Sequence, residues 1–191
     1  MKTVILNGAD YNGDKTDQIC EMFAEACGSK GCEVEMLTLR DMEIADCMGE
    51  FNCWIKTPGK CMTADEGQRI PQLLFQSHTV VMVTPITYGG HSYHLKKALD
   101  RIIPFVSPDF TIRDGEVHHK KRYERHPNFI AMGTLPEEDQ EQEKAFRNTI
   151  RRQAVNMDGP THLDSVILEG QSTDEVREEI QKLLREVGVV Q

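Results

Sequence analysis

Two glycine-containing turns, each directly after a short apolar run, are the parts of this chain best suited to binding chemistry. The first run, residues 2–8, opens into the polar stretch 9–16, and the second run, residues 79–84, opens into residues 84–90. In open parallel sheets, ligands bind in turns at the carboxyl ends of the strands. The two turns therefore predict a cofactor held between the first and third strands.

The first turn has the features of a phosphate site. A helix N-terminus offers an anion unpaired backbone N–H groups and the positive end of the helix dipole. Residues 9–16 lead into such a terminus, where the hydroxyl of Thr16 could add one more donor. Asp10 and Asp14 bring negative charge, which weakens phosphate binding unless both act as helix caps or face solvent.

The second turn is suited to a flat ring. Pro85 and the pair Gly89-Gly90 shape a turn whose backbone can approach a ring closely, and Tyr88 could pack beside it. His91 could hydrogen-bond the ring or a substrate, or could simply be a helix-entry residue.

Three of the six cysteines lie in the stretch 40–62, which has no helical or strand period. Their spacing is Cys47-x5-Cys53-x7-Cys61, with Glu50 midway between the first two. Three thiols do not complete a four-cysteine cluster, and zinc would need a fourth ligand such as Glu50 or a distant histidine. We predict no metal, with these cysteines as packing residues or reactive thiols. Trp54 in the same stretch is either a lid or subunit contact, or a small satellite core.

The basic segment 118–126 stands out in an acidic chain. It could receive the phosphates of a nicotinamide nucleotide, contact an acidic subunit face, or form a solvated strand edge. Its adjacent histidines, His118 and His119, would point to opposite faces of a strand, which argues against a shared metal ion.

Composition sets the broad class. The chain has 191 residues, of which 39% are hydrophobic and 28% charged, and a net charge of −9. These values predict one domain over residues 1–191 and argue against a general nucleic-acid role. No apolar run is long enough to span a bilayer, and the N-terminus enters a strand without a signal-peptide pattern. We therefore expect a cytoplasmic protein, without a membrane partner, whose cysteines stay reduced.

Strands and helices alternate along the chain, which predicts an α/β fold with a parallel sheet and helices on both faces. A capping box of Thr63 and Glu66 predicts a helix start, with a kink or restart at Pro71. A second capping box, Ser172 with Glu175, predicts the start of the last helix. Residues 104–127 are expected to be irregular apart from a hairpin turn at Asp114-Gly115. The expected strands are residues 2–8, 32–39, 79–84, 128–133 and 163–169, and the other expected helices are residues 15–28, 92–103 and 136–156.

Together these pieces resemble the flavodoxin-like NAD(P)H-dependent FMN reductases, and specifically a cluster-free relative of the iron-sulfur flavoproteins. The matching motifs are Ile5-Leu6-Asn7-Gly8 with Thr16, Cys53-Trp54-Ile55-Lys56-Thr57-Pro58-Gly59-Lys60-Cys61, Thr84-Pro85-Ile86-Thr87-Tyr88-Gly89-Gly90, and Leu95-Lys96-Lys97-Ala98-Leu99-Asp100-Arg101. The resemblance implies a three-layer sandwich with five parallel strands in the order 2-1-3-4-5.

The resemblance also implies a function. FMN would carry the redox chemistry with no catalytic side chain. NAD(P)H would be the co-substrate, and a quinone, flavin, nitro or azo compound the acceptor. A homodimer or homotetramer is expected. The implied contacts to FMN phosphate are Gly8, Asp10, Asn12, Asp14 and Thr16, and those to its ring are Pro85, Ile86, Thr87, Tyr88, Gly89 and Gly90.

One departure from the family pattern leaves alternatives open. The family's phosphate loop usually reads Asn-Gly-Ser-Pro-Arg, whereas this chain has Asn7-Gly8-Ala9-Asp10-Tyr11 and so lacks a hydroxyl and a cation. Two rival interpretations are a cofactor-poor binding or regulatory protein of the same fold, and a flavin electron-transfer module served by a partner protein.

Overall fold

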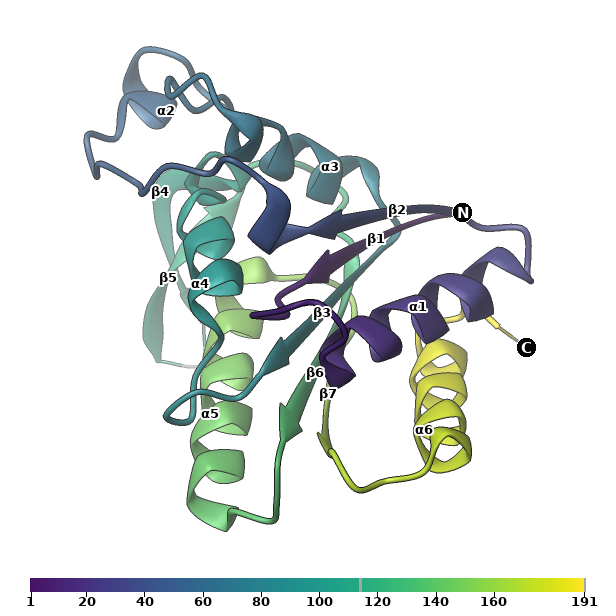
Figure 1. Cartoon of the computed structure of the whole chain (residues 1–191). Coiled ribbons are helices and arrows are strands. Elements are labelled where there is room, and N and C mark those ends of the chain that lie inside the picture. Colours follow the sequence, from purple (N-terminus) through teal and green to yellow (C-terminus); the bar gives the residue numbers. More distant parts are fainter. Residues whose placement is uncertain (114, 191) are drawn as a thin grey trace.

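A five-stranded parallel sheet forms the centre of the molecule, in the order β2-β1-β3-β6-β7 (Figure 1). The computed structural model describes residues 1–113 and 115–190. The strands are β1 Lys2–Asn7, β2 Glu33–Thr38, β3 Thr79–Pro85, β6 Asn128–Leu135 and β7 His162–Leu168. Since β6 and β7 are the fourth and fifth strands of this sheet along the chain, the predicted flavodoxin-like order 2-1-3-4-5 is confirmed.

Helices cover both faces of the sheet and make a three-layer sandwich. α1 and α6 lie on one face, and α3, α4 and α5 lie on the other (Figure 1). The α-helices are α1 Lys15–Gly28, α2 Asn52–Ile55, α3 Ile70–Gln76, α4 Tyr93–Asp100, α5 Gln140–Met157 and α6 Thr173–Glu186, and the 3-10 turns are η1 Leu39–Asp41, η2 Glu66–Arg69 and η3 Ile103–Phe105. No helix among the described residues combines the length and the apolar character needed to cross a membrane.

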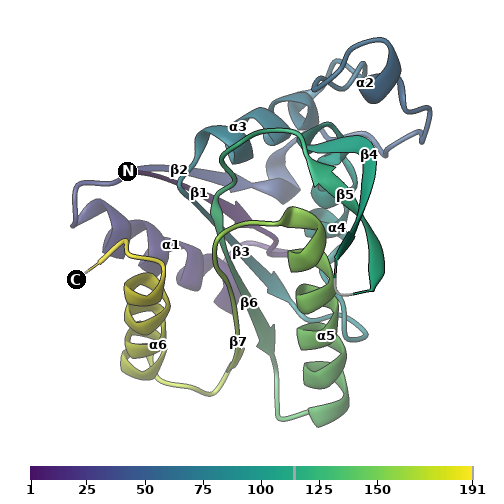
Figure 2. The ribbon, with the colours of Figure 1, turned by 180° about the vertical axis from the view of Figure 1, so that it is seen from behind.

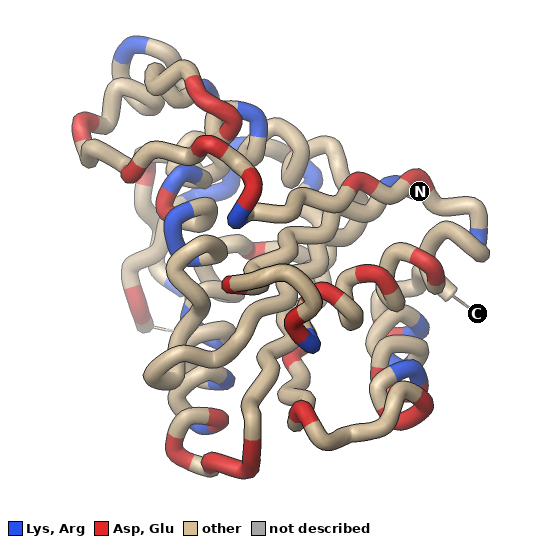
Figure 3. Tube along the Cα trace, viewed as in Figure 1, with Lys and Arg blue, Asp and Glu red and all other residues tan. Residues whose placement is uncertain are grey.

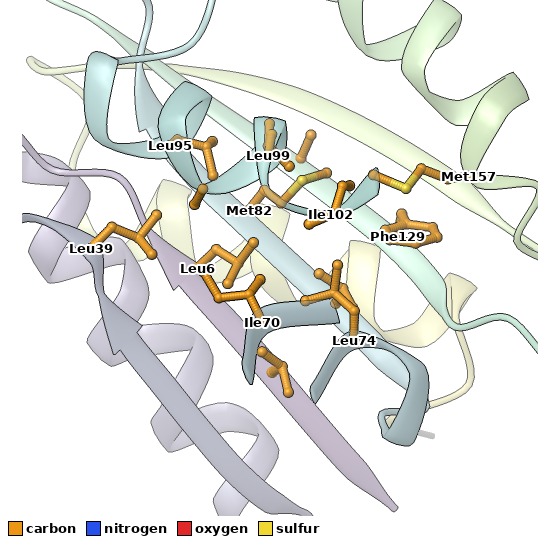
Figure 4. Close-up of a cluster of buried hydrophobic side chains, with 14 of the residues drawn as sticks. Leu6, Leu39, Ile70, Leu74, Met82, Leu95, Leu99, Ile102, Phe129 and Met157 are labelled. Atoms are coloured by element: carbon orange, nitrogen blue, oxygen red, sulfur yellow. The ribbon is translucent and has the colours of Figure 1, made fainter. Parts of the chain in front are cut away.

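Alternation along the strands divides the core into two apolar clusters. In β3, Val80 and Met82 face the helices α3 to α5, whereas Val81 and Val83 face α1 and α6. Successive strand side chains point to opposite faces, so an unbroken apolar run is what a strand buried on both faces requires. Figure 4 shows the first cluster, in which Leu6 of β1 and Phe129 of β6 join side chains from the covering helices.

One of the two predicted capping boxes forms and the other does not. Ser172 and Glu175 cap α6 reciprocally, as predicted. Thr63 and Glu66 do not form a box, because the Glu66 carboxylate instead accepts the backbone N–H of Glu43 at 2.7 Å. The helix restart expected at Pro71 is present, since α3 begins one residue before it.

The prediction that residues 104–127 are irregular is wrong. β4 Val106–Arg113 and β5 Glu116–Lys121 form an antiparallel pair beside α5 (Figure 2). A register shift between Val106 and Phe110 breaks the alternation that would have revealed β4. Arg113 lies opposite Glu116, as the predicted hairpin requires, although Asp114 itself lies outside the described residues.

The cysteine loop (residues 40–62) contains the single helical turn α2 and is held by Trp54. The indole Nε1 donates to the backbone oxygens of Ile103 at 3.2 Å and Val106 at 3.1 Å. The indole ring also packs between Phe51 and His119, with centroids 5.2 Å apart in each case. Trp54 is half-buried and packs against the main core cluster, so it fastens the loop to that core and does not form the separate satellite core that was one of its predicted roles.

Candidate cofactor site

The two predicted turns meet at the carboxyl edge of the sheet, where β1 and β3 end side by side. The Gly8 N–H donates to the Val83 oxygen at 2.8 Å, and the Ser92 hydroxyl donates to the Gly8 oxygen at 2.6 Å. A Cβ added to Gly8 would lie 2.9 Å from both Leu95 Cβ and the Val83 oxygen. Only glycine therefore allows this close approach of the two turns.

The first turn, residues 8–14, is folded around the carboxylate of Asp17. This carboxylate accepts Asn7 Nδ2 at 2.7 Å and the Gly13 N–H at 3.0 Å. The Asn7 amide oxygen in turn accepts the Ala9 N–H at 3.0 Å. Gly13 has a φ of 80°, which explains why glycine occupies that position.

Arg40, from η1, and its partner Asp17 are residues of this site that sequence reasoning missed. The Nη1 of Arg40 lies 2.7 Å from Asp17 Oδ1, while its Nε and Nη2 donate to the Asn12 amide oxygen at 3.0 and 2.6 Å. Arg40 thus brings a cation to a loop that appeared from its own sequence to have none. The only sequence signal was its position directly after a strand that neighbours β1.

The Asp17 carboxyl is held in its charged form. Burial raises its pKa, but the hydrogen bonds from Arg40, Asn7 and Gly13 outweigh burial and lower the pKa overall. The turn is therefore locked by an ionised carboxylate at neutral pH.

Several backbone N–H groups of the first turn have no acceptor. Within residues 1–113 and 115–190, the N–H groups of Asp10, Tyr11 and Asn12 make no hydrogen bond to the protein. They precede the N-terminus of α1, so they and the helix dipole favour an anion at the same place. A phosphate group fits this arrangement.

The acidic residues of this turn differ in their surroundings. Asp14 caps α1, its carboxylate accepting the Thr16 N–H at 2.7 Å, and Asp10 is exposed. The two aspartates therefore take the roles, cap and solvent-facing side chain, that are compatible with a phosphate nearby. Thr16 is fully buried and its hydroxyl lies 3.2 Å from that of Thr134, so it ties α1 to β6.

The second turn is a two-residue hairpin. Thr87 and Gly90 exchange both backbone hydrogen bonds, at 3.0 and 3.1 Å. The two residues between them, Tyr88 and Gly89, have φ values of 50° and 71°. Positive φ at both positions is typical of a type I′ turn, and it is costly for tyrosine. The Tyr88 side chain is 99% exposed.

The second turn is fastened to β6 and α5. The Ile86 N–H donates to the Thr134 oxygen at 2.9 Å, and the Gly89 N–H donates to Gln142 Oε1 at 3.3 Å. His91 packs edge-on against Phe146 and contacts Gln153, and burial lowers its pKa. His91 thus acts as a half-buried support of the turn in its neutral form.

The basic segment, another predicted feature, is not brought to this edge. The basic segment 118–126 contacts the ends of α3 and α5 instead, with Arg125 near Phe75 and Gln76 and His126 bonded to Met157. These contacts lie at the opposite, amino edge of the sheet. Near the site, charge is mostly negative, and Figure 3 shows acidic residues in the loop leading into α5.

The fold is flavodoxin-like, and the two joined turns lie at the carboxyl edge of its sheet, where ligands bind in folds of this kind. The sequence model of the NADPH-dependent FMN reductase family matches residues 1–122. The chain belongs to this family, and its predicted resemblance is confirmed.

Curated relatives carry the name iron-sulfur flavoprotein. One from Methanocaldococcus jannaschii is 28% identical over 104 residues, covering 54% of this chain and 53% of the relative. Another, from Archaeoglobus fulgidus, is 29% identical over 101 residues, covering 53% and 48%. The chain spans about half the length of the curated relatives that it matches.

Solved structures share the fold over nearly the whole chain. An NAD(P)H:quinone oxidoreductase from Methanothermobacter marburgensis has a TM-score of 0.67 at 13% identity, covering 99% of this chain and 96% of that one. An FMN-dependent NADH-azoreductase from Bacillus anthracis, in complex with FMN, has a TM-score of 0.66 at 15% identity, covering 97% and 96%.

Proposed function

We propose that this chain is an FMN-dependent NAD(P)H oxidoreductase that passes electrons to a small acceptor such as a quinone, a flavin, or a nitro or azo compound. The observation that carries the proposal is the pair of turns joined through Gly8 and Val83, one with unpaired N–H groups and one with an exposed aromatic ring. Family membership and the structural neighbours support it.

The first turn holds the phosphate in this proposal. The free N–H groups of Asp10, Tyr11 and Asn12 would donate to its oxygens, and the α1 dipole would favour its charge. The absence of a Cβ at Gly8 keeps this turn close to β3. Arg40 pairs with Asp17 and binds the Asn12 amide oxygen, and these contacts keep the loop in shape before FMN arrives.

The second turn holds the isoalloxazine ring. Pro85 and Ile86 end β3 at the site, and Thr87 and Gly90 fix the hairpin that presents Tyr88 and Gly89. FMN held there would supply the redox chemistry between NAD(P)H and the acceptor. No side-chain acid or base is needed, so the protein's contribution is position and electrostatics.

A binding and bleaching experiment tests this proposal. FMN is added to the purified protein, free FMN is removed by desalting, and the flavin absorption that stays with the protein is measured. Retained flavin that NADH or NADPH bleaches under anaerobic conditions supports the reductase. A protein that releases all FMN is instead the cofactor-poor binding protein. One that keeps FMN but is not reduced by either nucleotide is an electron-transfer module.

We further propose that the protein is a homodimer or homotetramer. Apolar side chains are exposed together on the β4–β5 hairpin, namely Phe110, Ile112 and Val117, and Ile55 of α2 is exposed as well. Exposed apolar groups of this kind mark interaction surfaces. Light scattering of Ile112→Glu should give the monomer mass, while Met36→Glu, at an exposed site on β2, should keep the oligomer.

We also propose a cytoplasmic location. All six cysteines are free thiols in the structure, which suits a reducing compartment. Thiol titration of protein taken directly from fractionated cells should recover six reduced thiols in the cytoplasmic fraction.

A further inference from the structure

Three thiols of the cysteine loop surround one small cavity, away from the joined turns. Cys47, Cys53 and Cys61 line it together with Glu50 and Arg101, and its volume is about 20 Å³. A cavity needs roughly 10–15 Å³ to admit a water molecule. The space beside the thiols therefore admits a molecule of one or two heavy atoms.

An iron-sulfur cluster does not fit these residues, although the matched relatives are named iron-sulfur flavoproteins. A cluster of this type takes four cysteine thiolates, and this loop offers three, with Glu50 midway between Cys47 and Cys53. Among the described residues, no group of three His, Cys, Asp or Glu side chains is arranged to hold a metal ion. The thiols are free to react with one another.

A buried guanidinium is aimed at one of the thiols. The Arg101 side chain is 1% exposed, and its Nη2 lies 3.3 Å from the Cys61 sulfur. Both terminal nitrogens also bind the Asp65 carboxylate, at 2.6 and 2.8 Å, which fixes the guanidinium in place. Its Nε has no hydrogen-bond partner in the described part of the chain. This charged N–H group, held in place by Asp65, points at the Cys61 sulfur and orients it within the cavity.

Cys53 is the natural partner of Cys61. It is buried in the same cavity wall, and burial, followed by the nearby Cys61, Glu50 and Cys47, raises its pKa, so it stays a thiol. The chain between the two cysteines is closed on itself, because the Gly59 N–H donates to the Cys53 oxygen at 3.0 Å. The two residues thus lie at the ends of a tight loop rather than on separate elements.

We propose that Cys61 and Cys53 form a peroxide-reactive dithiol, a redox site separate from the flavin site. The Cys61 sulfur attacks hydrogen peroxide: an S–O bond forms, the O–O bond breaks, and the second oxygen leaves as water with the proton of the Cys61 thiol. The sulfur is oxidised by two electrons to sulfenic acid. The Cys53 sulfur then displaces the sulfenic oxygen, an S–S bond forms, and the oxygen leaves as water with the Cys53 proton. A dithiol reductant restores both thiols with two electrons and two protons.

The cavity selects the oxidant. Hydrogen peroxide has two heavy atoms and fits a space of about 20 Å³, whereas a glutathione-type disulfide does not. The full chain should therefore react with hydrogen peroxide faster than with a glutathione-type disulfide.

The test is the mass of the intact chain after treatment with hydrogen peroxide, with and without bound FMN. The wild type should lose about 2 Da, regained with dithiothreitol, and peptide mapping should join Cys53 to Cys61. Cys53→Ser should instead stop at a sulfenic acid that dimedone traps at Cys61. Cys61→Ser should oxidise about tenfold more slowly, since the sulfur that attacks the peroxide is lost.

Two matched cysteine variants test whether Cys53 and Cys61 are the pair that reacts. Cys47→Ser and Cys32→Ser, which remove a cavity thiol and a thiol outside the cavity, should still form the Cys53–Cys61 disulfide. Mapping that joins Cys47 to either other thiol, or equal oxidation of Cys61→Ser and wild type, would overturn the proposal. So would stable retention of iron and sulfide after anaerobic reconstitution. Because the readout is mass and the assay includes flavin-free protein, failure here is distinct from failure to bind FMN.

Discussion

The Asp17 carboxylate and the Arg40 guanidinium form an ion pair at 2.7 Å that joins the first turn of α1 to the chain after β2. The same carboxylate holds Asn7 at the end of β1 and Gly13 in the turn. The Asp17 side chain therefore fixes three segments around the turn whose backbone N–H groups could bind an anion. Both members of the pair are mostly buried, which limits solvent screening of the interaction.

Asp17→Asn should weaken FMN binding by about tenfold. The substitution keeps the shape of the side chain but removes the charge that orders Arg40 and the turn, and hydrogen bonds to charged groups are worth about 1.5–3 kcal/mol. Titration of the flavin-free protein with FMN, followed by flavin fluorescence, measures the change. Asp41→Asn is the control, because Asp41 is exposed and 3.9 Å from Arg40. Equal losses in the two variants would contradict the assigned role of Asp17.

The Asp17–Arg40 ion pair should also make the free energy of unfolding depend on pH in acid. The pKa of Asp17 is lowered in the folded state, so its contribution is fully present above the unfolded pKa, about 3.9, and is lost as pH falls through the folded value. The difference in free energy of unfolding between wild type and Asp17→Asn should be constant from about pH 5 to 8 and shrink below about pH 4. Urea unfolding at several pH values checks this. A difference that shrinks between pH 6 and 8 would point to a histidine instead.

Asp65→Asn should destabilise the fold by about 3 kcal/mol, because it leaves the buried Arg101 guanidinium without its counter-ion. Arg101 pairs with Asp65, and not with its neighbour Asp100 as its position in the sequence suggests. Asp100 instead pairs with Lys96 on the surface of α4, so Asp100→Asn should change stability by less than about 0.5 kcal/mol. Urea unfolding of both variants measures the contrast. Equal losses would mean that the Asp65 pair is not buried in solution.

Local patterns explain which features could be predicted from sequence. α1 was predicted at residues 15–28 and is found there, because an apolar stripe, a cap and a terminal glycine all lie within one segment. The site turns were predicted because each directly follows a buried strand. Arg40 and the Asp65–Arg101 pair were missed because their partners lie 23 and 36 residues away, and only the tertiary fold brings them together. β4 was missed because its register shift hides a strand period.

Gly89→Ala should destabilise the second turn through one steric contact and one strained dihedral. An added Cβ would lie 2.5 Å from Ala145 Cβ, and the φ of 71° disfavours any residue with a Cβ. A loss of about 2–3 kcal/mol is expected. The double variant Gly89→Ala/Ala145→Gly should recover the steric part, so the double-mutant cycle should give a coupling of about 1 kcal/mol or more. Additive losses in urea unfolding would show that the turn does not pack on α5.

Tyr88→Asn should raise the stability of the flavin-free protein while weakening FMN binding. Tyr88 is nearly fully exposed at a φ of 50°, a conformation that asparagine adopts at lower cost, so the free energy of unfolding should rise by about 0.5–1 kcal/mol. Loss of the ring beside the isoalloxazine should cost about 1 kcal/mol of binding, or roughly fivefold in Kd.

The exposed Tyr93 of α4 provides the matched control, because it has ordinary helical geometry. Tyr93→Asn should bring no gain in stability and leave the Kd for FMN unchanged. Thermal unfolding without flavin and fluorescence titration with FMN separate the two effects. A Tyr88→Asn protein that gains stability and still binds FMN as tightly as the wild type would show that strain at Tyr88 serves something other than the flavin ring. Because strained residues persist where the surrounding structure holds them for a function, the opposite signs of the two effects are the specific signature expected of a cofactor platform.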